Sequence, residues 1–571
     1  MPYYMIEDFQ YGLDLRKSPV TAPPGTLRKL VNAHITPGGE VEKAKGWALF
    51  AELPPGTHGL HAVRNQLFTF GETDLAGEMP PGITYQRIQP PLDFGSVVRI
   101  LDTDTFDGKP YVITEFSTGQ VSHFYDGVLV PDWDVLGQEV ASPELVRIRL
   151  VEQINTTTPF TAGIDGEKIQ VTSPTDNAPF FVSARPFSGI RAEETVPAEE
   201  GVFSQWEIEL LAFSPGQTYL IDIRVGDPQQ PTGKWSISLP ARVAGISRSC
   251  KTFGSKMYAV AGSILFFSSR NDPTKWLSGQ GQGLINLATH SGESSLLTGI
   301  GIYQNHLAVF SRRAVQVWSV GADPDENVRL QVLENVGSLA SGSVRSFGNI
   351  DLFFLSDTGV RSLRARDSSN LASAQDVGSS IDSLVRGLLR DTPQPEFSPS
   401  AIEPENGKYL LSVGGQIIVF SHFPGAKVSA WAVYDPGLDF TDFAVANNRL
   451  YARAGDNIYL YGGPEGDEYP SDVETEVQTP FLSAETPGTQ KTLRGLDVGC
   501  EGEWDIYLHP DPASPELNEH LGTLSGTTYG FQPRFMIGGQ TTHFSLRFVH
   551  KGPGYARLSN VAVHYDLGQS G

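Results

Sequence analysis

The side chains that could carry out chemistry in this chain do not follow the spacing of a known reaction centre. The stretch Asp102-Thr-Asp-Thr-Phe-Asp-Gly108 has the closely spaced carboxylates of a calcium-binding loop. However, it has an extra residue before the glycine, and Ile113 stands at the twelfth position, where such a loop needs a bidentate glutamate. We therefore interpret this stretch as a tight acidic turn.

Histidine and cysteine, the usual zinc ligands, are too widely spread to predict a metal site. Of the 12 histidines, His58 and His61 are the nearest pair, and no His-Glu-x-x-His motif or zinc-spaced cysteine partner is present. Cys250 and Cys500 lie in strand-like contexts, so we expect small buried apolar residues and not a disulfide or a metal pair. The sequence predicts neither a metal nor a cofactor.

Motifs of nucleophilic and nucleotide chemistry are also missing. There is no Gly-x-Ser-x-Gly elbow, P-loop or dinucleotide fingerprint in a strand–turn–helix setting. Ser268–Trp276 has an aspartate turn like those of sialidase propellers, but it lacks their glycine and occurs once. No pair stands out among the 65 acidic residues for glycoside cleavage. The sequon at Asn155 matters only in a secreted eukaryotic chain. We predict no catalytic residues and no enzymatic activity.

A recurring hairpin is the main structural signal. A short apolar strand, a Gly/Asn turn and a second apolar strand appear in Ser249–Gly262, Thr298–Phe310, Val344–Leu355 and Phe440–Ala452. Including weaker copies, the turns are at Asn65, Gly108, Gly254, Asn305, Asn349, Asn406 and Asn448. Apart from one interval, they recur every roughly 40 to 60 residues, close to the period of a four-stranded propeller blade. The sequence predicts an all-β chain with a propeller of six to eight blades.

The exceptional interval separates Gly108 from Gly254. It exceeds one blade by about 100 residues, the size of a small domain. We interpret it as an inserted β-domain that interrupts the propeller. A long β-sandwich with coincidental turn spacing remains the alternative.

Composition and charge agree with an all-β chain that has no membrane-spanning segment. The 60 glycines and 40 prolines punctuate short apolar runs, and no run of about 18 apolar residues occurs. The acidic N-terminus does not have the pattern of a secretory signal. The net charge of −23 disfavours binding to nucleic-acid phosphates. It is consistent either with solubility alone or with a surface past which DNA moves without sticking.

The chain divides into five predicted parts. They are an N-terminal segment at 1–50, the first propeller blades at 51–139, the inserted β-domain at 140–243, the remaining blades at 244–471, and a C-terminal β-sandwich at 472–571. In the insertion, alternating apolar residues predict strands at Leu145–Val151, Trp206–Leu211 and Trp235–Leu239. In the C-terminal part the same alternation runs through Leu496–Cys500, Trp504–Leu508, Phe544–Phe548 and Val561–Tyr565.

One helix is predicted, at Ser379–Arg390. Ile381, Leu384, Val385, Leu388 and Leu389 form a single apolar stripe. Ser379 or Ser380 is expected to cap its start, and Pro393 to stop it. We expect the helix to pack on the side of the propeller, although a partner-docking helix is the alternative.

Three groups of segments carry a resemblance to a known family. They are Gly12–Val20 with Pro24–Lys45, Val336–Val344 continuing through Phe354–Val360 into the predicted helix at Ser379–Arg390, and Leu493–Gly502 with Leu558–Tyr565. Together they resemble the tail nozzle proteins, also called tail tubular B or tail-stabilisation proteins, of short-tailed bacteriophages. The resemblance covers both ends and the middle of the chain, and its motifs are packing and turn motifs.

The resemblance implies a structural virion protein made in the bacterial host's cytoplasm. Such a protein forms a homo-hexameric ring below the portal and the adaptor ring, contacts tail fibres or tailspikes, and takes part in genome retention and ejection. Genomic DNA would pass through its lumen without specific binding. The inserted domain is the best candidate for contacting neighbouring subunits or fibres, or for forming the nozzle tip. The sequence assigns no single residue to an interface or to the DNA channel.

Two other functions fit an all-β propeller. A receptor-binding or glycan-binding propeller would expose clustered aromatic residues on one face and would be a monomer or a trimer. A glycan-degrading enzyme would place a carboxylate pair in the central cavity. A mass measurement of the particle separates both from a hexameric nozzle.

Overall fold

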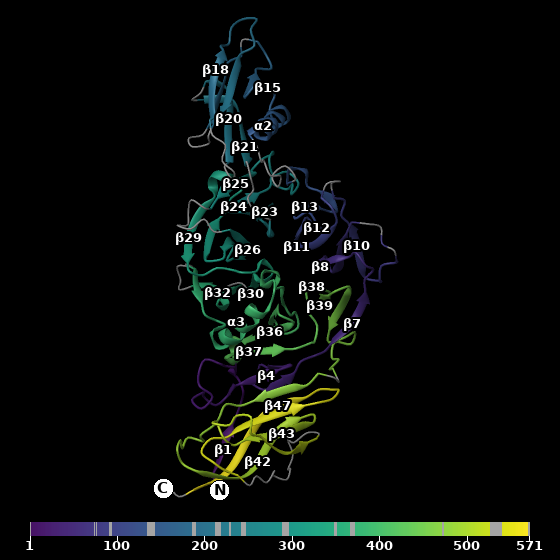
Figure 1. Cartoon of the computed structure of the whole chain (residues 1–571), viewed down its shortest axis with the longest axis vertical. Helices are drawn as coiled ribbons and strands as arrows, with labels where there is room; N and C mark the ends of the chain where they lie inside the picture. Colours follow the sequence, from purple (N-terminus) through teal and green to yellow (C-terminus); the bar gives the residue numbers. More distant parts are fainter. Residues whose placement is uncertain are drawn as a thin grey trace. The chain divides into compact units, whose positions relative to one another are not determined.

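The computed structural model describes residues 2–72, 75, 77–90, 94–133, 143–176, 178–184, 190–211, 218–227, 230–240, 247–287, 296–347, 351–365, 372–470, 473–525 and 539–568. Most of them lie in short β-strands, so the predicted all-β class is confirmed (Figure 1). The chain folds into two compact units, which are Met1–Arg87 with Gly301–Val317 and Leu330–Gly571, and Ile88–Ile300 with Trp318–Arg329. Within the described residues, no helix has the length and apolarity needed to span a membrane.

The predicted hairpin repeat appears as small sheets of successive strands. The first unit contains β8 (His58–Val63), β9 (Gln66–Gly71) and β10 (Ile83–Arg87); β30 (Arg345–Phe347), β31 (Asp351–Ser356), β32 (Gly359–Ala365) and β33 (Ala372–Gln375); β34 (Ser400–Ile402), β35 (Tyr409–Val413), β36 (Gln416–Phe423) and β37 (Val428–Tyr434); and β38 (Asp442–Ala446), β39 (Arg449–Ala454) and β40 (Asn457–Tyr461).

The second unit repeats the pattern. It contains β11 (Val97–Phe106), β12 (Lys109–Phe116), β13 (Val121–Tyr125) and β14 (Val128–Leu129), and also β22 (Ser249–Phe253), β23 (Lys256–Ala261), β24 (Ile264–Phe267) and β25 (Gly283–Asn286). One further sheet, which the division into units crosses, has β26 (Leu297–Tyr303), β27 (His306–Ser311), β28 (Ala314–Ser319) and β29 (Val328–Glu334). The described residues therefore form a propeller-like series of seven such sheets.

The inner strands of these sheets are mostly apolar and are buried on both faces. Every residue of β23 and of β35 is buried. A strand that is covered on both sides reads as a continuous apolar run and does not alternate. This is why the sequence shows short apolar runs in the repeat.

The turns that revealed the repeat have a backbone conformation that favours Asn and Gly. Two successive residues have positive φ at Arg64-Asn65, Asp107-Gly108, Gly254-Ser255, Gln304-Asn305 and Asn447-Asn448. Two positive φ angles define the type I′ turn, whose twist matches that of paired strands and which favours Asn and Gly. Asn406 lies in the loop between β34 and β35, and Asn349 lies outside the described residues.

The N-terminal segment completes one of the sheets. Strand β7 (Trp47–Glu52) pairs antiparallel with β40, so the order of this sheet is β38-β39-β40-β7. The next sheet is attached to it by Arg453, whose guanidinium donates to the carbonyl oxygens of Thr57 and Gly59 at 2.5 and 3.0 Å. The repeat therefore joins sequence from near both ends of the chain.

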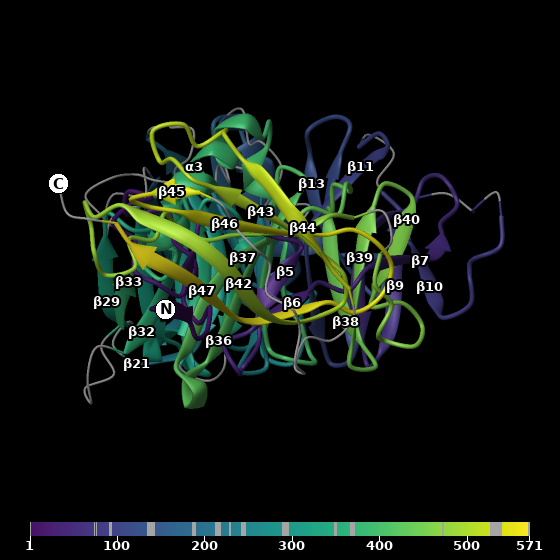
Figure 2. The same cartoon turned by 90° about the horizontal axis from the view of Figure 1, so that it is seen from below.

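Two larger sheets form where the ends of the chain meet. In one, β47 (Arg557–Leu567) pairs with β42 (Lys491–Glu501), β1 (Tyr3–Ile6) and β6 (Val41–Lys43), and β5 (Ala33–Ile35) and β45 (Gln540–Thr541) flank them. Figure 2 shows this sheet from below. In the other, β4 (Lys29–Val31), β41 (Thr475–Gln478), β46 (Ser545–His550), β43 (Trp504–His509) and β44 (Glu519–Leu524) continue the sheet of β34–β37, beside which β2 (Gly12–Leu13) and β3 (Thr26–Leu27) pair.

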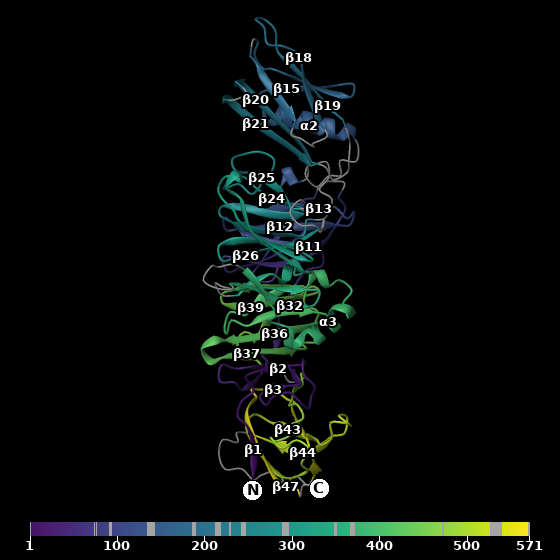
Figure 3. The same ribbon diagram turned by 90° about the vertical axis from the view of Figure 1, so that its left-hand side faces the viewer.

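The alternating apolar residues of the C-terminal part face one core, as the sequence predicts. Leu496, Val498 and Cys500 of β42 are buried with Trp504, Ile506 and Leu508 of β43 and with Val561, Val563 and Tyr565 of β47. The same core contains Ile6, Leu30, Ile35 and Val41 from the N-terminal strands. The N-terminal strands β1 and β4–β6 and the C-terminal strands β41–β47 thus share sheets and a core (Figure 3).

The segment at 140–243 has a core of its own. Its sheets are β15 (Thr161–Asp165), β16 (Lys168–Thr172), β19 (Gln205–Leu210) and β18 (Ile190–Val196), and β17 (Phe180–Ala184), β20 (Thr218–Asp227) and β21 (Gln230–Pro240). Strands β19 and β21 are at the predicted positions. The strand predicted at Leu145–Val151 is wrong, because these residues lie in helix α2 (Pro143–Thr157).

The error has a physical reason. Apolar residues at Val146, Ile148 and Leu150 alternate as in a strand, but Val146, Leu150 and Ile154 also recur at every fourth position, as on one face of a helix. In the structure this second set is fully buried, whereas Ile148 is 37 % exposed. Packing of Val146, Leu150 and Ile154 onto the sheets therefore favours the helix.

The predicted helix near 379–390 is present as α3 (Asp382–Asp391), after the 3₁₀ turn η3 (Ser379–Ile381). Its stripe faces a core in which Ile381 and Val385 are buried. The expected serine cap is wrong, because no side chain caps either element, and Ile381 precedes the α-helix. Instead, Asp382 in the first turn forms two bonds with Arg361 of β32, at 2.8 and 2.9 Å.

Candidate functional site

The most developed polar arrangement in the first unit is a buried junction between the N-terminal strands and the propeller-like sheets. Its centre is His34 on β5, whose Nδ1 lies 3.0 Å from the hydroxyl of Tyr434 and whose Nε2 lies 3.3 Å from Nζ of Lys408. All three side chains are buried. Because an ammonium group can only donate, Nε2 must accept, and Nδ1 therefore donates to Tyr434.

The surroundings of this imidazole disfavour its protonation. Burial lowers the pKa of His34 well below its usual value, and the charges of Lys408 and Lys45 lower it further. Burial also lowers the pKa of Lys408, which Glu403 and Glu42 oppose. The carboxylate of Glu403 lies 3.9 Å from Nζ of Lys408 and accepts two backbone N–H groups at 2.8 and 2.9 Å.

Two lysines of the N-terminal segment extend the junction. Nζ of Lys43 donates to the carbonyl oxygens of Pro470 and Gly552, at 2.8 and 2.7 Å, although the residue is only 1 % exposed. Lys45 pairs with Glu405 at 2.5 Å. These bonds connect β6 and the residues after it to three distant parts of the chain. The junction therefore has a structural role. Its buried bonds hold strands in register, and none of the side chains named in it is an exposed nucleophile.

A shift in pH tests this geometry. Because the folded state disfavours protonation of His34, the unfolded state binds more protons below about pH 6.5, so the protein must lose stability as the pH falls through that range. One such group contributes at most about 1.4 kcal/mol per pH unit. We expect His34→Gln, which can still accept from Lys408 and donate to Tyr434, to flatten the slope of stability between pH 6.5 and 5.

The measurement is urea unfolding at several pH values. His520→Gln is the matched control, since His520 lies on an accessible surface with its side chain 48 % exposed. The control removes a histidine outside the junction, so a change of slope that occurs only in His34→Gln reports on the buried imidazole. An unchanged slope in His34→Gln would contradict the buried, neutral imidazole.

The acidic stretch at 102–108 forms a turn only at its end, and its first carboxylates accept backbone N–H groups. Asp102 and Asp104 lie on β11, and only Asp107 and Gly108 form the turn. Asp102 accepts the N–H of Cys250 at 3.0 Å, and Asp104 accepts that of Thr252 at 2.5 Å. The interpretation as a tight turn is therefore wrong for the first carboxylates, which join β11 to the neighbouring sheet.

The other sequence candidates lie apart and have structural contacts. Within the residues that the structure describes, no three His, Cys, Asp or Glu side chains are grouped as metal ligands. His58 and His61 lie on β8. In Ser268–Trp276, Asp272 accepts two bonds from Thr274, and Trp276 is buried. Cys250 and Cys500 are both buried and are not joined to each other, as predicted.

A buried histidine chain in the second unit escaped the sequence analysis. Nδ1 of His123 lies 2.8 Å from the hydroxyl of Tyr111, and its Nε2 lies 2.9 Å from the hydroxyl of Ser247. A hydroxyl beside an imidazole resembles a nucleophile with its base. However, Tyr111, His123 and Ser247 are all buried, and the indole of Trp133 stacks on the imidazole with the ring centroids 3.7 Å apart. Ser247 is 124 residues from His123 in the sequence, so no spacing could have revealed the chain.

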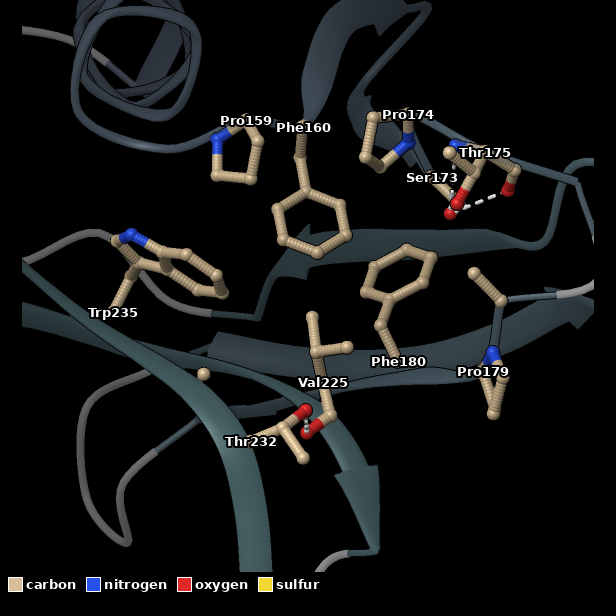
Figure 4. A pocket seen from close by; sticks show the side chains of 12 residues that line it. Pro159, Phe160, Ser173, Pro174, Thr175, Pro179, Phe180, Val225, Thr232 and Trp235 are labelled. Atoms are coloured by element: carbon tan, nitrogen blue, oxygen red, sulfur yellow. Dashed lines mark hydrogen bonds between the residues drawn. The ribbon is translucent and has the colours of Figure 1, made fainter.

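An apolar pocket of about 250 Å³ lies in the segment that carries α2 and β15–β21. Figure 4 shows Phe160, Phe180 and Trp235 around it, with prolines at its rim. None of its lining side chains is ionisable. The pocket can therefore accommodate apolar groups but offers no acid, base or metal ligand.

Comparisons with known proteins identify no family. No protein-family profile matches the chain, and no curated protein matches it. Among solved structures, the chain is similar to the WD40 domain of Pan2 from Neurospora crassa, with 11 % identity over 53 % of this chain and 88 % of that one, at a TM-score of 0.26. At this TM-score the likeness supports no conclusion about function.

Proposed function

We propose that this chain is a structural virion protein that forms the nozzle of a short phage tail. In this role it builds a ring-shaped DNA conduit below the portal and adaptor, and takes part in genome retention and in ejection into the host. The observation that carries the proposal is the way the three groups of resembling segments come together within the first unit.

The first and third groups share a sheet. Strands β5 and β6, from Pro24–Lys45, join β47, which contains Leu558–Tyr565. Strand β47 in turn pairs along β42, which contains most of Leu493–Gly502. Segments from opposite ends of the chain are therefore hydrogen-bonded neighbours.

The first and second groups share a core. Leu13 is buried with Ala340, Leu355 and Val360 in one apolar cluster. The N–H of Leu15 donates to the carbonyl oxygen of Ser380 at 2.7 Å. Since motifs that resemble one family also contact one another, the resemblance concerns a common scaffold, which favours an assembly role over a local active site.

The proposed partners follow from this role. Six copies would form a closed ring through heterologous contacts, in which each subunit presents two different surfaces. The adaptor ring and the tail fibres or tailspikes would bind outside the lumen. With a net charge of −23, the ring would let DNA slide past without the counter-ion release that accompanies tight binding.

The decisive experiment is a native mass measurement of the full chain, alone and mixed with its adaptor ring. We expect a hexamer in at least the mixture, because a nozzle must match the ring above it. A stable trimer, or a monomer that does not bind the adaptor ring, would refute the nozzle function. In an assembled particle, a basic lumen would refute the proposed passage of DNA along an acidic wall.

A further inference from the structure

A second pocket, in the first unit, is polar and differs from the junction. It has a volume of about 550 Å³, within the usual range for small-molecule sites of roughly 300–1,000 Å³. Its walls come from β31, β32, β36 and β37, from the N-terminal loop around Asp14, and from the residues that precede α3. Six of its lining residues carry the argument: Asp14, Arg16, Asp351, Arg364, Phe420 and Trp431.

Charges in this pocket occur as opposite pairs. Arg16 holds Asp14 with two side-chain bonds, at 3.0 and 2.7 Å. Nε of Arg364 lies 3.6 Å from Oδ1 of Asp351. Asp376, which also lines the pocket, pairs with Arg361, whose Nε lies 3.0 Å from Oδ1 of Asp376. Each of these carboxylates therefore has an arginine partner, so the pocket is not built for a ligand of strong net charge.

The pair at Asp351 is incomplete. Its side chain is nine-tenths buried, and Oδ1 has no hydrogen-bond donor among the residues that the structure describes. The distance of 3.6 Å to Arg364 allows attraction between charges but is too long for a hydrogen bond. Burial accordingly raises the pKa of Asp351. A buried carboxylate that lacks a donor is costly, and a ligand that donates a hydrogen bond would relieve that cost.

The lack of a hydrogen-bond donor to Oδ1 of Asp351 restricts the chemical class of ligand that the pocket can bind. A phosphate or carboxylate ligand would approach Asp14 and Asp351 with like charge and would bring acceptors where a donor is needed. A cationic ligand such as an ammonium could donate to the carboxylate but would bring no acceptor for the guanidinium groups of Arg16 and Arg364. A neutral hydroxyl can donate to a carboxylate and accept from a guanidinium in the same pocket. The rings of Phe420 and Trp431 add apolar wall against which C–H groups can pack.

We propose that this pocket binds a neutral saccharide unit through Asp351 and Arg364. The sugar hydroxyl donates to the carboxylate, and another hydroxyl or the ring oxygen accepts from the guanidinium. This binding does not depend on the proposed nozzle role: a hexamer could have the site or lack it, and the two experiments can fail separately.

The test is isothermal titration calorimetry of the full chain with glucose, galactose, N-acetylglucosamine, maltose and lactose, with inorganic phosphate as a separate arm. We expect at least one of these sugars to bind in preference to phosphate. Asp351→Asn keeps the shape of the side chain but removes its charge. It should lower the affinity for that sugar about tenfold, because charge-assisted hydrogen bonds are stronger than neutral ones.

Asp357→Asn is the matched control. Asp357 also pairs with an arginine, Arg312, but on an accessible surface outside the pocket. It should leave sugar binding unchanged, and both variants should keep the unfolding midpoint of the parent within a few degrees. The proposal is overturned if none of the five sugars binds, if phosphate binds in their place, or if a folded Asp351→Asn binds the sugar as tightly as the parent.

Discussion

Replacing Lys408 with methionine is expected to lower the free energy of unfolding by about 3–5 kcal/mol, the usual cost of removing one partner from a buried ion pair. Its side chain is 2 % exposed and that of Glu403 is 3 % exposed. Without the ammonium, Glu403 would retain an uncompensated buried charge, and Nε2 of His34 would lose its donor. Urea unfolding at neutral pH measures the loss.

The matched control for this loss is Arg390→Met. Arg390 also pairs with an acidic residue, Asp391, but both side chains are about four-fifths exposed, at 81 % and 78 %. Exposed pairs contribute about 0–1 kcal/mol, so the control should barely change stability. Adding Glu403→Gln to Lys408→Met should restore part of the loss, since the two side chains interact directly. Equal effects of Lys408→Met and Arg390→Met would contradict the buried junction.

Truncating Trp504 to alanine should cost about 3–5 kcal/mol, as large aromatic truncations in cores do. Trp504 is fully buried, and its indole N–H donates to the carbonyl oxygen of Glu501 at 2.8 Å. Its core also contains Ile6 and Ile35. Hydrogen exchange should therefore accelerate together in the C-terminal strands and in β1 and β5, although these lie at opposite ends of the sequence.

Two comparisons make this result specific. Leu517→Ala, at a side chain that is 54 % exposed, should leave both stability and exchange near those of the parent. Peptides from α2, which belongs to a different core, should keep their protection in Trp504→Ala. If the N-terminal strands kept their protection while the C-terminal strands lost it, the shared core would be refuted.

The sequence was most informative where a local rule determines the conformation. Turns such as Gln304-Asn305 were predictable, because positive φ angles favour Asn and Gly whatever surrounds them. The C-terminal alternation was predictable because one face of each strand is buried. Helix α2 was not, because the apolar residues from Val146 to Leu150 fit two periods, and only the packing of Ile154 with them decides between those periods.

The polar sites could not be predicted for another reason. His34 contacts Lys408 and Tyr434, which lie hundreds of residues away in the sequence. Asp351 and Trp431 line one pocket only after β31 and β37 are in place. No spacing in the sequence encodes such contacts, since they depend on the order of the strands in the sheets. The pairing of β7 with β40 is of the same kind, because nothing in Trp47–Glu52 identifies its partner.

That pairing determines the order in which the molecule can be completed during its synthesis. Strand β7 leaves the ribosome early, but β40 follows roughly 400 residues later, which at about 5–20 residues per second is a delay of roughly 20–80 s. Throughout that time the unpaired edge of β7 is available to other chains, including sister copies at an earlier stage. The growing chain thus exposes an edge that pairs only with a strand made near the other end of its own sequence.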